Sequence, residues 1–484
     1  MLGLELSGNF SVSGLLLAIL CFYLIGGRLI RIYLFENTGR SVMRPRPVVQ
    51  VVVVGDIGRS PRMRYHAVSL ADSGCTVDLI GYVETPVGSR ISAHRYIRVR
   101  PLKQAWSVPK GLPKPLYLIW APFKALFLSI QLWWLMGCVT QFPDFIFVQN
   151  PPSIPTLAVA RLVSFLRQAW LIIDWHNFGY SILGVTLGMN HPVVRWAKRY
   201  EKFFGNKAYA HLTVTTRLRK ELEEWNVQGK MITFRDRPQS HFKRLSLPEV
   251  HEFLQNCHIE DVVKKQTLDA DKFLGYDNNA VTTLLTRKET NDTVIYRSDR
   301  PRLIVSSTSW TEDEDFSLLL KAVEHYEQEA PIEAPRLLFV ITGKGPLKDH
   351  YEKMISRMQL KRTRIITMWL EAYQYPLLLG SADLGISLHT SSSGMDLPMK
   401  VVDMFGCGLP VCAVNFECLD ELVVNNKNGL VFDTDDQLAA QLLDLFVTHP
   451  ERLETLRANV LSEYASLTWE NQWKDILMEL FPAA

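Results

Sequence analysis

The chain has 484 residues, of which 47% are hydrophobic and 21% are charged, and its formal net charge is +3. This length exceeds one compact domain, and the apolar fraction is ample for folded cores. A balanced charge without long Lys/Arg runs argues against a nucleic-acid-binding protein. The seven cysteines are scattered, and Cys407 and Cys412 lack the paired spacing of a zinc site. We therefore expect free thiols in a reducing compartment and no metal.

An apolar segment near the N-terminus, residues 10–27, carries no charge and is followed at once by Arg28 and Arg31. Together with the next residues it reaches the ~20 residues that a membrane-spanning helix needs. Positive charge on the C-terminal side predicts that the bulk of the chain lies in the cytosol. A cleaved signal peptide would carry that charge before the apolar run. We therefore expect residues 1–46 to be an uncleaved single-pass anchor with a basic flank.

Residues 47–240 alternate between predicted strands and helices. The β-branched run 47–54 is typical of a strand buried on both faces of a parallel sheet. Ser60 as N-cap and Pro61 at the first helical position predict a helix that Gly74 ends, and a strand at 76–82 completes a βαβ unit. Further strands are expected at 145–149, 169–174 and 212–215, and further helices at 154–167 and 192–204.

Two segments break this alternation. Residues 116–139 are almost entirely apolar and contain three tryptophans, but Pro122 and Lys124 argue against a membrane-spanning helix. Either a core helix or a helix lying in the bilayer interface fits this composition. Residues 241–300 are polar and weakly periodic, which predicts an interdomain connector.

The alternation resumes in residues 301–460 and ends in a C-terminal helix within 461–484. Strands are expected at 303–307, 336–342, 365–367, 384–388, 410–414 and 430–432. The fold class is therefore α/β, with two Rossmann-like, doubly wound parallel-sheet domains. Such sheets bind ligands outside the carboxyl ends of their strands, and the cleft between two such domains is the expected site.

Two motifs in the second half could bind a nucleotide diphosphate. The first, 343–346, follows a strand and opens a helix, where free amides and the helix dipole favour anions, although such turns are common in this fold. The second, 389–403, passes through a hydroxyl-rich loop into a helix that carries Lys400 and, one turn later, Asp403. The Asp403 carboxylate could bind the ribose hydroxyls of a nucleotide, or it could simply pair with Lys400. The candidate donor-binding residues are Gly343, Lys344, Gly345, His389, Ser392, Gly394, Lys400 and Asp403.

Two loops in the first half also follow predicted strands. Asp174 and His176 come directly after a buried strand, which improves the odds that this histidine is functional rather than structural. The loop after the first strand contains Asp56 but lacks the GxGxxG pattern of a dinucleotide site. The candidate acceptor-side residues from these loops are Gly55, Gly58, Arg59 and Asn177.

Two remaining motifs have simpler interpretations. The acidic run 311–315 opens a predicted helix, where negative charge is favourable by itself. The triplet 291–293 matches a glycosylation acceptor, which stays unmodified if the predicted topology keeps it in the cytosol.

Several blocks together resemble the chitobiosyldiphosphodolichol β-mannosyltransferase family. They are GDIGRSPRM from Gly55, QNPPSIP from Gln149, IIDWHNFGYSI from Ile172, SSTSWTEDEDF from Ser306, TGKGPL from Thr342, SADLGISLHTSSSGMDLPMKVVDMFGCGLPVCAV from Ser381 and NGLVF from Asn428. These blocks span nearly the whole chain. The resemblance implies a GT-B fold, two Rossmann-like domains facing a cleft, in an enzyme of the endoplasmic reticulum membrane whose catalytic part is cytosolic.

The same resemblance implies the reaction: transfer of the first mannose from GDP-mannose to GlcNAc₂-diphosphodolichol in a β-1,4 linkage. An α-linked donor and a β-linked product require a single inverting displacement with a general base. His176 is the first candidate for the base, and Asp174 or Asp56 the next. No cofactor beyond the donor substrate is implied. The expected partners are dolichol-diphosphate-linked chitobiose, the membrane and other mannosyltransferases of the pathway, with no nucleic acid.

Two alternatives stay open at this point. A non-catalytic scaffold of the same fold could assemble partner transferases, although the glycines, lysines and carboxylates of a donor site are all present. A transferase with another nucleotide-sugar donor would carry the same motifs.

Overall fold

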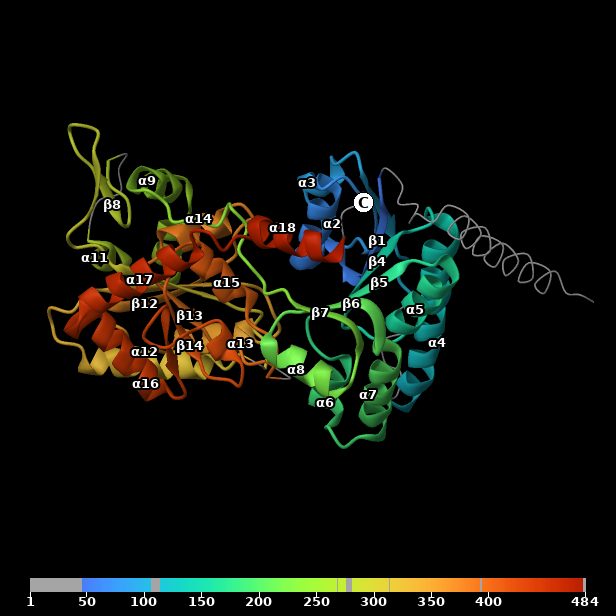
Figure 1. Ribbon diagram of the computed structural model, residues 1–484. Helices are drawn as coiled ribbons and strands as arrows, with labels where there is room; N and C mark the ends of the chain where they lie inside the picture. Colours follow the sequence, from blue (N-terminus) through green and yellow to red (C-terminus); the bar gives the residue numbers. More distant parts are fainter. Residues whose placement is uncertain are drawn as a thin grey trace, which may run out of the picture. The chain divides into compact units, whose positions relative to one another are not determined.

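The computed structural model describes residues 46–105, 114–267, 269–275, 281–312, 314–391 and 394–481, so the anchor predicted at residues 10–27 lies outside the described residues. The chain divides into two compact units (Figure 1). The first contains the chain up to Val214, then Leu218–Phe234, and again the chain from Ile476. The second contains Thr215–Arg217 and Arg235–Asp475.

The first unit is built on a parallel sheet of seven strands in the order β3-β2-β1-β4-β5-β6-β7. The strands are β1 (Val48–Asp56), β2 (Thr76–Tyr82), β3 (Ile97–Pro101), β4 (Phe145–Asn150), β5 (Trp170–Trp175), β6 (Lys207–Thr213) and β7 (Gln228–Thr233). The helices are α2 (Pro61–Asp72), α3 (Ser89–Ser92), α4 (Lys114–Trp134), α5 (Thr156–Arg167), α6 (Gly179–Leu187), α7 (Pro192–Gly205) and α8 (Thr216–Glu224).

Strand β1 forms the centre of this sheet because five of its six valines are buried, on both faces. Each buried valine contributes about 1.5–3 kcal/mol relative to an exposed one. Gln50 is the polar exception within the run and is fully buried. Its Nε2 donates to the carbonyl of Met136 at 2.9 Å and to Oγ1 of Thr140 at 2.7 Å. These bonds connect the strand to the segment that follows α4 and offset the cost of burying the Nε2 group.

Helix α2 begins and ends where the sequence predicts, but its cap differs. Ser60 occupies the N-cap position without a side-chain cap, and its hydroxyl donates instead to the carbonyl of Asp56 at 3.1 Å. Gly74 follows the helix with φ +94°, a value that favours glycine. The connection from β1 through α2 to β2 runs one way along the sheet, and the connection from β4 through α5 to β5 runs the other way. Because such connections are right-handed, α2 covers one face of the sheet and α5 covers the other.

Helix α4 is not a core helix, contrary to one of the two sequence interpretations. Within the described residues, the segment Trp120–Val139 is the one helix long and apolar enough to cross a membrane, and 17% of that stretch is buried. Leu132 and Met136 face the interior, whereas Leu126 is 59% exposed and Trp134 is 56% exposed. Its apolar face is therefore left largely uncovered by the first unit.

The second unit contains a six-stranded parallel sheet in the order β12-β11-β10-β13-β14-β15. The strands are β10 (Arg302–Ser307), β11 (Leu337–Thr342), β12 (Thr363–Met368), β13 (Leu384–Ser387), β14 (Val411–Val414) and β15 (Gly429–Phe432). The principal helices are α12 (Phe316–Glu329), α13 (Lys348–Ile355), α14 (Gln374–Ser381), α15 (Met399–Gly406), α16 (Asp435–Leu443), α17 (Pro450–Tyr464) and α18 (Trp469–Leu480).

The segment 241–300 is part of the second unit rather than a connector. Its elements are α9 (Leu247–Asn256), α10 (Ile259–Gln266), α11 (Ala270–Leu274) and the hairpin β8 (Thr286–Lys288) and β9 (Val294–Tyr296). Apolar side chains such as Phe253 and Leu284 join the core built around β10 and α15. The polar composition misled the sequence interpretation because short amphipathic helices bury few residues each.

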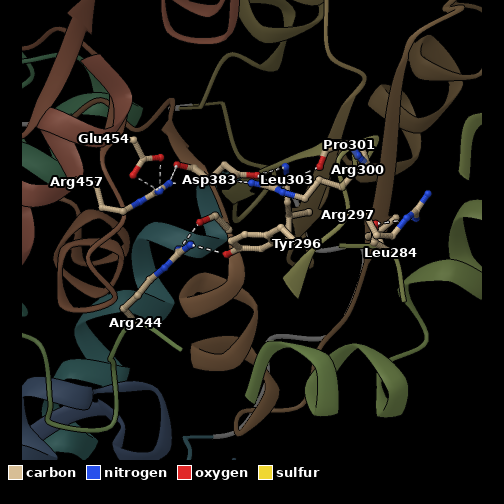
Figure 2. Close-up of polar contacts among 11 residues, drawn as sticks. Arg244, Leu284, Tyr296, Arg297, Arg300, Pro301, Leu303, Asp383, Glu454 and Arg457 are labelled. Atoms are coloured by element: carbon tan, nitrogen blue, oxygen red, sulfur yellow. Dashed lines mark hydrogen bonds and ion pairs between the residues drawn. The ribbon is translucent and has the colours of Figure 1, made fainter. Parts of the chain in front are cut away.

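Figure 2 shows the arginine cluster that secures this segment to the sheet. Arg300 makes two hydrogen bonds to Asp383 at 2.7 and 2.8 Å, and Arg457 donates to the carbonyl of Asp383 at 2.9 Å. Arg244 donates to the hydroxyl of Tyr296 at 3.3 Å. Burial opposes ionisation of Asp383, but the arginines outweigh it and lower its pKa to about 2. The cluster is therefore an internally paired structural network.

The predicted fold class is confirmed: two doubly wound α/β units with parallel sheets. The elements expected between residues 303 and 480 are present with boundaries that shift by a few residues. The unit boundaries differ more, because the first unit ends at Phe234 and resumes at Ile476, inside α18.

Candidate active site

A buried carboxylate organises the carboxyl end of β5 in the first unit. Asp174 is inaccessible to solvent and accepts two hydrogen bonds from Arg62, from Nε at 2.8 Å and from Nη2 at 2.9 Å. Nε2 of His66 lies 3.0 Å from the same carboxylate, and Nε2 of His176 lies 2.9 Å from it. Phe234 packs against the Arg62 guanidinium, 4.7 Å from its ring centre. Three side chains, Arg62 and His66 from α2 and His176 from the loop after β5, thus converge on one aspartate.

The charges in this cluster are arranged to keep Asp174 ionised. Burial alone would raise its pKa, but Arg62 and the two histidines hold the pKa of Asp174 well below its usual range. Burial lowers the pKa of His66, which favours its neutral form despite the neighbouring carboxylate. His176 is the exposed member of the cluster, since 23% of its side chain is accessible. The buried, ionised Asp174 therefore holds the partly exposed His176 ring in one orientation.

The loop after β1 uses its carboxylate to hold itself in shape. Asp56 accepts hydrogen bonds from the hydroxyl of Thr85 at 2.6 Å and from the backbone amides of Glu84 at 3.1 Å and Gly58 at 3.3 Å. Burial raises the pKa of Asp56, but these bonds outweigh it and the net shift is downward. Arg59 lies 3.6 Å from the same carboxylate with 75% of its side chain exposed. The Arg59 side chain is therefore largely open to solvent.

Gly55 and Gly58 of that loop differ in the space that a side chain would have. A Cβ added to Gly58 would lie 2.1 Å from Oγ1 of Thr85, so the loop needs glycine there to close. A Cβ on Gly55 would meet its nearest atom at 4.0 Å, in Val53. Gly58 is therefore required by packing, and Gly55 is not.

Asn177 lies in the turn that begins α6 and is almost fully buried. Its Oδ1 accepts from the backbone amide of Phe178 at 2.7 Å. Glu201, buried on α7, accepts from the amides of Gly179 at 2.9 Å and Tyr180 at 3.1 Å and from Asn150 at 2.7 Å. These two side chains fix the backbone that follows His176, so Asn177 orients the loop from within.

In the second unit, the predicted donor motifs gather at the carboxyl ends of β10, β11 and β13. The loop after β11 lies directly on the loop after β10. A Cβ on Gly343 would lie 1.8 Å from the carbonyl oxygen of Thr308, and one on Gly345 would lie 1.7 Å from that of Ser309. Nε1 of the buried Trp310 donates to the carbonyl of Gly343 at 3.3 Å. Both glycines are thus explained by the close approach of two loops.

The two lysines of these motifs have different partners. Nζ of Lys344 lies 4.0 Å from the ring centre of Trp369, which follows β12, and the lysine is exposed. Lys400 pairs with Glu314, a buried carboxylate that also accepts from the hydroxyl of Thr308 and from the amide of Ser309 at 2.8 Å. Glu314 belongs to the acidic run that the sequence assigned to helix-end electrostatics. It instead positions Lys400 beside the β10 loop.

Asp403 does not pair with Lys400, although the two share a helix face. Among the described residues no hydrogen bond or ion pair reaches its carboxylate. Burial raises its pKa to about 8, and the nearby charge of Asp236 acts in the same direction. The hydroxyl of the neighbouring Tyr375 bonds instead to Ser307 at 3.1 Å. Asp403 is thus a partly buried carboxyl with capacity to bond a ligand.

Asp396 contacts two residues at the start of the second motif. Ser391 donates to Asp396, and Nε2 of His389 lies 3.9 Å from it. Gly394 has φ +72°, which favours glycine. Ser392 lies outside the described residues, so its predicted role has no structural account.

Comparison with known proteins now identifies the family. The description "Glycosyl transferase 4-like domain" matches residues 58–234, and "Glycosyl transferases group 1" matches residues 288–462. A mouse chitobiosyldiphosphodolichol β-mannosyltransferase is 44% identical over 91% of this chain and 90% of its own length. The human protein of the same name is 43% identical over 89% of this chain and 92% of its own length.

The chain belongs to the chitobiosyldiphosphodolichol β-mannosyltransferase family. An Arabidopsis thaliana relative, 40% identical over 88% of this chain and 95% of its own length, is named UDP-glycosyltransferase TURAN. Solved structures share the GT-B fold at low identity. Sucrose-phosphate synthase from Thermosynechococcus elongatus covers 91% of this chain and 100% of its own, with TM-score 0.60 and 13% identity. Anabaena HepE in complex with UDP and glucose covers 90% and 99%, with TM-score 0.58 and 12% identity.

Within this family member, sequence analysis missed three buried residues that hold the candidate site together: Arg62, His66 and Glu314. Arg62 and His66 lie four residues apart on α2 and therefore share one face. That spacing was a usable signal. No local signal pointed to Glu314, because its partner Lys400 is 86 residues away along the chain.

Proposed function

We propose that the chain transfers mannose from GDP-mannose to the terminal GlcNAc hydroxyl of a dolichol-diphosphate-linked chitobiose, forming a β-1,4 bond and releasing GDP. The acceptor class follows from the names of relatives that match about nine-tenths of this chain. We place the reaction at the endoplasmic reticulum membrane with both units in the cytosol, because arginines follow the apolar segment 10–27.

In the proposed mechanism His176 is the general base. The donor is α-linked and the product β-linked, so the acceptor oxygen displaces GDP once, on the face opposite the leaving group. Asp174 holds Nε2 of His176, which leaves Nδ1 as the ring nitrogen that can take the acceptor proton. Asp174 is fully buried and acts as a positioning residue. Asp56 is committed to its own loop and is the weaker alternative.

The second unit carries the donor in this proposal. Bond cleavage leaves negative charge on the diphosphate, which Lys400 and the amides after β11 and β13 would stabilise. Asp403 would bond the ribose hydroxyls. We propose that no metal is required, since lysines and backbone amides supply the positive charge. Full turnover in the presence of excess EDTA is the expected result, and a metal-dependent rate would contradict it.

The observation that carries the proposal is the partly exposed His176 held on an ionised, buried aspartate at the carboxyl end of β5. The test is mannose transfer from GDP-mannose to a chitobiosyl-diphosphate lipid. His176→Ala should lower turnover by roughly a hundredfold or more, the usual loss for a general base. GDP affinity should be unchanged, because His176 and Asp403 belong to different units.

Asp403→Ala is the matched control for donor binding. Loss of two ribose hydrogen bonds, each worth about 0.5–1.5 kcal/mol, weakens GDP binding by roughly five- to a hundredfold. Calorimetry with GDP on both folded variants separates the roles. If His176→Ala binds GDP as poorly as Asp403→Ala, the assignment of donor and acceptor to separate units is wrong.

A second candidate is transfer from a uridine nucleotide sugar, favoured by the name of the Arabidopsis relative, UDP-glycosyltransferase TURAN. A donor screen with GDP-mannose, UDP-glucose and UDP-GlcNAc on the same acceptor decides between the two. Nucleotide binding without turnover on any donor would support the scaffold alternative instead.

A further inference from the structure

The loop after β12 exposes an aromatic side chain beside the candidate donor motifs. The Trp369 indole is 56% exposed, whereas Met368 and Leu370 on either side of it are buried. The two buried neighbours anchor the backbone of this residue while its ring stands open to solvent. Nζ of Lys344, from the loop after β11, lies 4.0 Å from the centre of that ring. This geometry is a cation–π contact at an exposed site.

The backbone around Lys344 is held firmly, so any movement there belongs to the side chain. A Cβ on Gly343 would overlap the carbonyl of Thr308, and one on Gly345 would overlap that of Ser309. Lys344 lies between these two close contacts of the β11 loop with the β10 loop. Its flexible four-carbon stem can carry the ammonium group to a new position without a change in the backbone.

The two lysines of the donor motifs are held very differently. Lys400 pairs with Glu314, a buried carboxylate that also accepts from the hydroxyl of Thr308. Among the described residues no carboxylate pairs with Lys344, and its ammonium group contacts the ring of Trp369. A pair that includes a buried charge resists separation, whereas a cation–π contact at an exposed site is weak. Lys400 is therefore fixed, and Lys344 can be released at low cost.

The strand order shows in which direction Lys344 points. In the sheet, β11 lies between β12 and β10, and β13 follows β10. The connections leave β10 and β13 in opposite directions, and ligands of doubly wound sheets bind at such a point. The contact with Trp369 directs the ammonium group of Lys344 toward β12, away from this point. Neighbouring strands are about 4.8 Å apart, a step that a lysine side chain can cross.

We propose that Trp369 is a positioning residue for Lys344: its indole holds the ammonium group on the β12 side until the diphosphate of the nucleotide draws it across β11. The inference rests on the proposed function in one respect, which is that a diphosphate binds beside Lys400. Lys344 then adds a second positive charge as the donor enters, and it returns to the ring when GDP leaves. Trp369 and the diphosphate therefore compete for the same cation.

The sign of one affinity change tests the proposal. Trp369→Leu removes the competing partner, so GDP should bind about two- to fivefold more tightly, which is the exposed cation–π energy of about 0.5–1 kcal/mol expressed as affinity. Inorganic pyrophosphate should show the same gain, since it carries the charge and lacks the nucleoside. Tyr373→Leu is the matched control, because Tyr373 is 71% exposed in the same loop and should leave both affinities unchanged. Calorimetry on the full chain in detergent measures both ligands, and thermal unfolding checks that each variant is folded.

The gain in affinity must depend on Lys344. Lys344→Met should weaken the binding of both ligands by roughly threefold or more, because a charged hydrogen bond is lost. Adding Trp369→Leu to Lys344→Met should then change neither affinity, so the two substitutions are non-additive. A 5-fluorotryptophan label gives a second readout, in which the fluorine resonance of Trp369 is identified by its absence from Trp369→Leu. This resonance should shift with pyrophosphate in the unmodified chain and stay in place in Lys344→Met.

Weaker binding of GDP by Trp369→Leu would overturn the proposal, because the indole would then contact the nucleotide itself. An unchanged affinity would overturn it too, as would a gain that persists in the Lys344→Met background or pyrophosphate that fails to bind the unmodified chain. The pyrophosphate measurements require no sugar transfer. If they follow the expected pattern while mannose transfer fails, the movement of Lys344 stands and the proposed function falls. If transfer succeeds and the pattern fails, the proposed function stands and the movement of Lys344 falls.

Discussion

Replacing Asp174 by asparagine tests whether this residue is a structural centre or a catalytic acid–base group. The substitution preserves shape but removes the negative charge that Arg62 and two histidines share. Arg62 is 3% exposed, so its guanidinium would remain in the interior without a counter-charge. We expect Asp174→Asn to destabilise the first unit severely, and to lower activity mainly through folding.

The magnitude follows from the geometry. Two charge-assisted hydrogen bonds at 2.8 and 2.9 Å join Arg62 to Asp174. Removing one partner of such a buried pair costs about 3–5 kcal/mol, mostly as the penalty of the charge left behind. For a unit of this size each kcal/mol lowers the midpoint of unfolding by about 2–4 °C. The expected fall in the midpoint is therefore roughly 6–20 °C.

Thermal unfolding in detergent measures this fall. His176→Gln is the matched control, because it perturbs the same carboxylate from a partly exposed position and should cost about 1 kcal/mol or less. Arg62→Met combined with Asp174→Leu removes both charges and should recover more than half of the loss. The reasoning is refuted if Asp174→Asn unfolds like the unmodified chain, or if the double variant is no more stable than the single one.

Three further predictions concern the second unit. Because the pKa of Asp403 is raised to about 8, the folded ligand-free protein retains a proton that the unfolded chain releases above about pH 4. The free energy of unfolding therefore falls as the pH rises between these values, by up to about 1.4 kcal/mol per pH unit. Chemical denaturation of Asp403→Asn should thus show an advantage that widens from pH 5 to 8, and parallel curves would contradict it. Gly343→Ala should destabilise by roughly 2–4 kcal/mol, because its Cβ would overlap the Thr308 carbonyl at φ +139°, whereas Gly55→Ala, with open space, should cost less than about 1 kcal/mol. Asn291 is exposed, so mass spectrometry should find it unglycosylated if this unit is cytosolic, and a glycan there would reverse the proposed topology.

Some features were decided locally and could be predicted from the sequence. The valine run of β1, the Ser-Pro helix start of α2 and the alternation of apolar segments are patterns set by neighbouring residues. They predicted the parallel α/β class, the strand ends near which His176 and Lys344 lie, and the helix start that carries Lys400. Such patterns are visible because burial on a sheet or helix face repeats with a short period.

Other features depended on residues far apart in the chain. The polar segment 241–300 folds because Arg300 meets Asp383 and short helices share one core, which no local pattern reveals. Helix α4 could be a core helix or an interfacial one until the structure left Trp134 and its neighbours uncovered.

The candidate site shows the same division. Its residue types and strand-end positions were set by the sequence, whereas their partners were decided by tertiary structure. Asp174 is buried by Arg62 and His66, 112 and 108 residues away, and Lys400 is held by Glu314 rather than by the nearer Asp403. Ionisation and orientation depend on which charges are brought together and how deeply they are desolvated, and those distances exist only once the chain is folded.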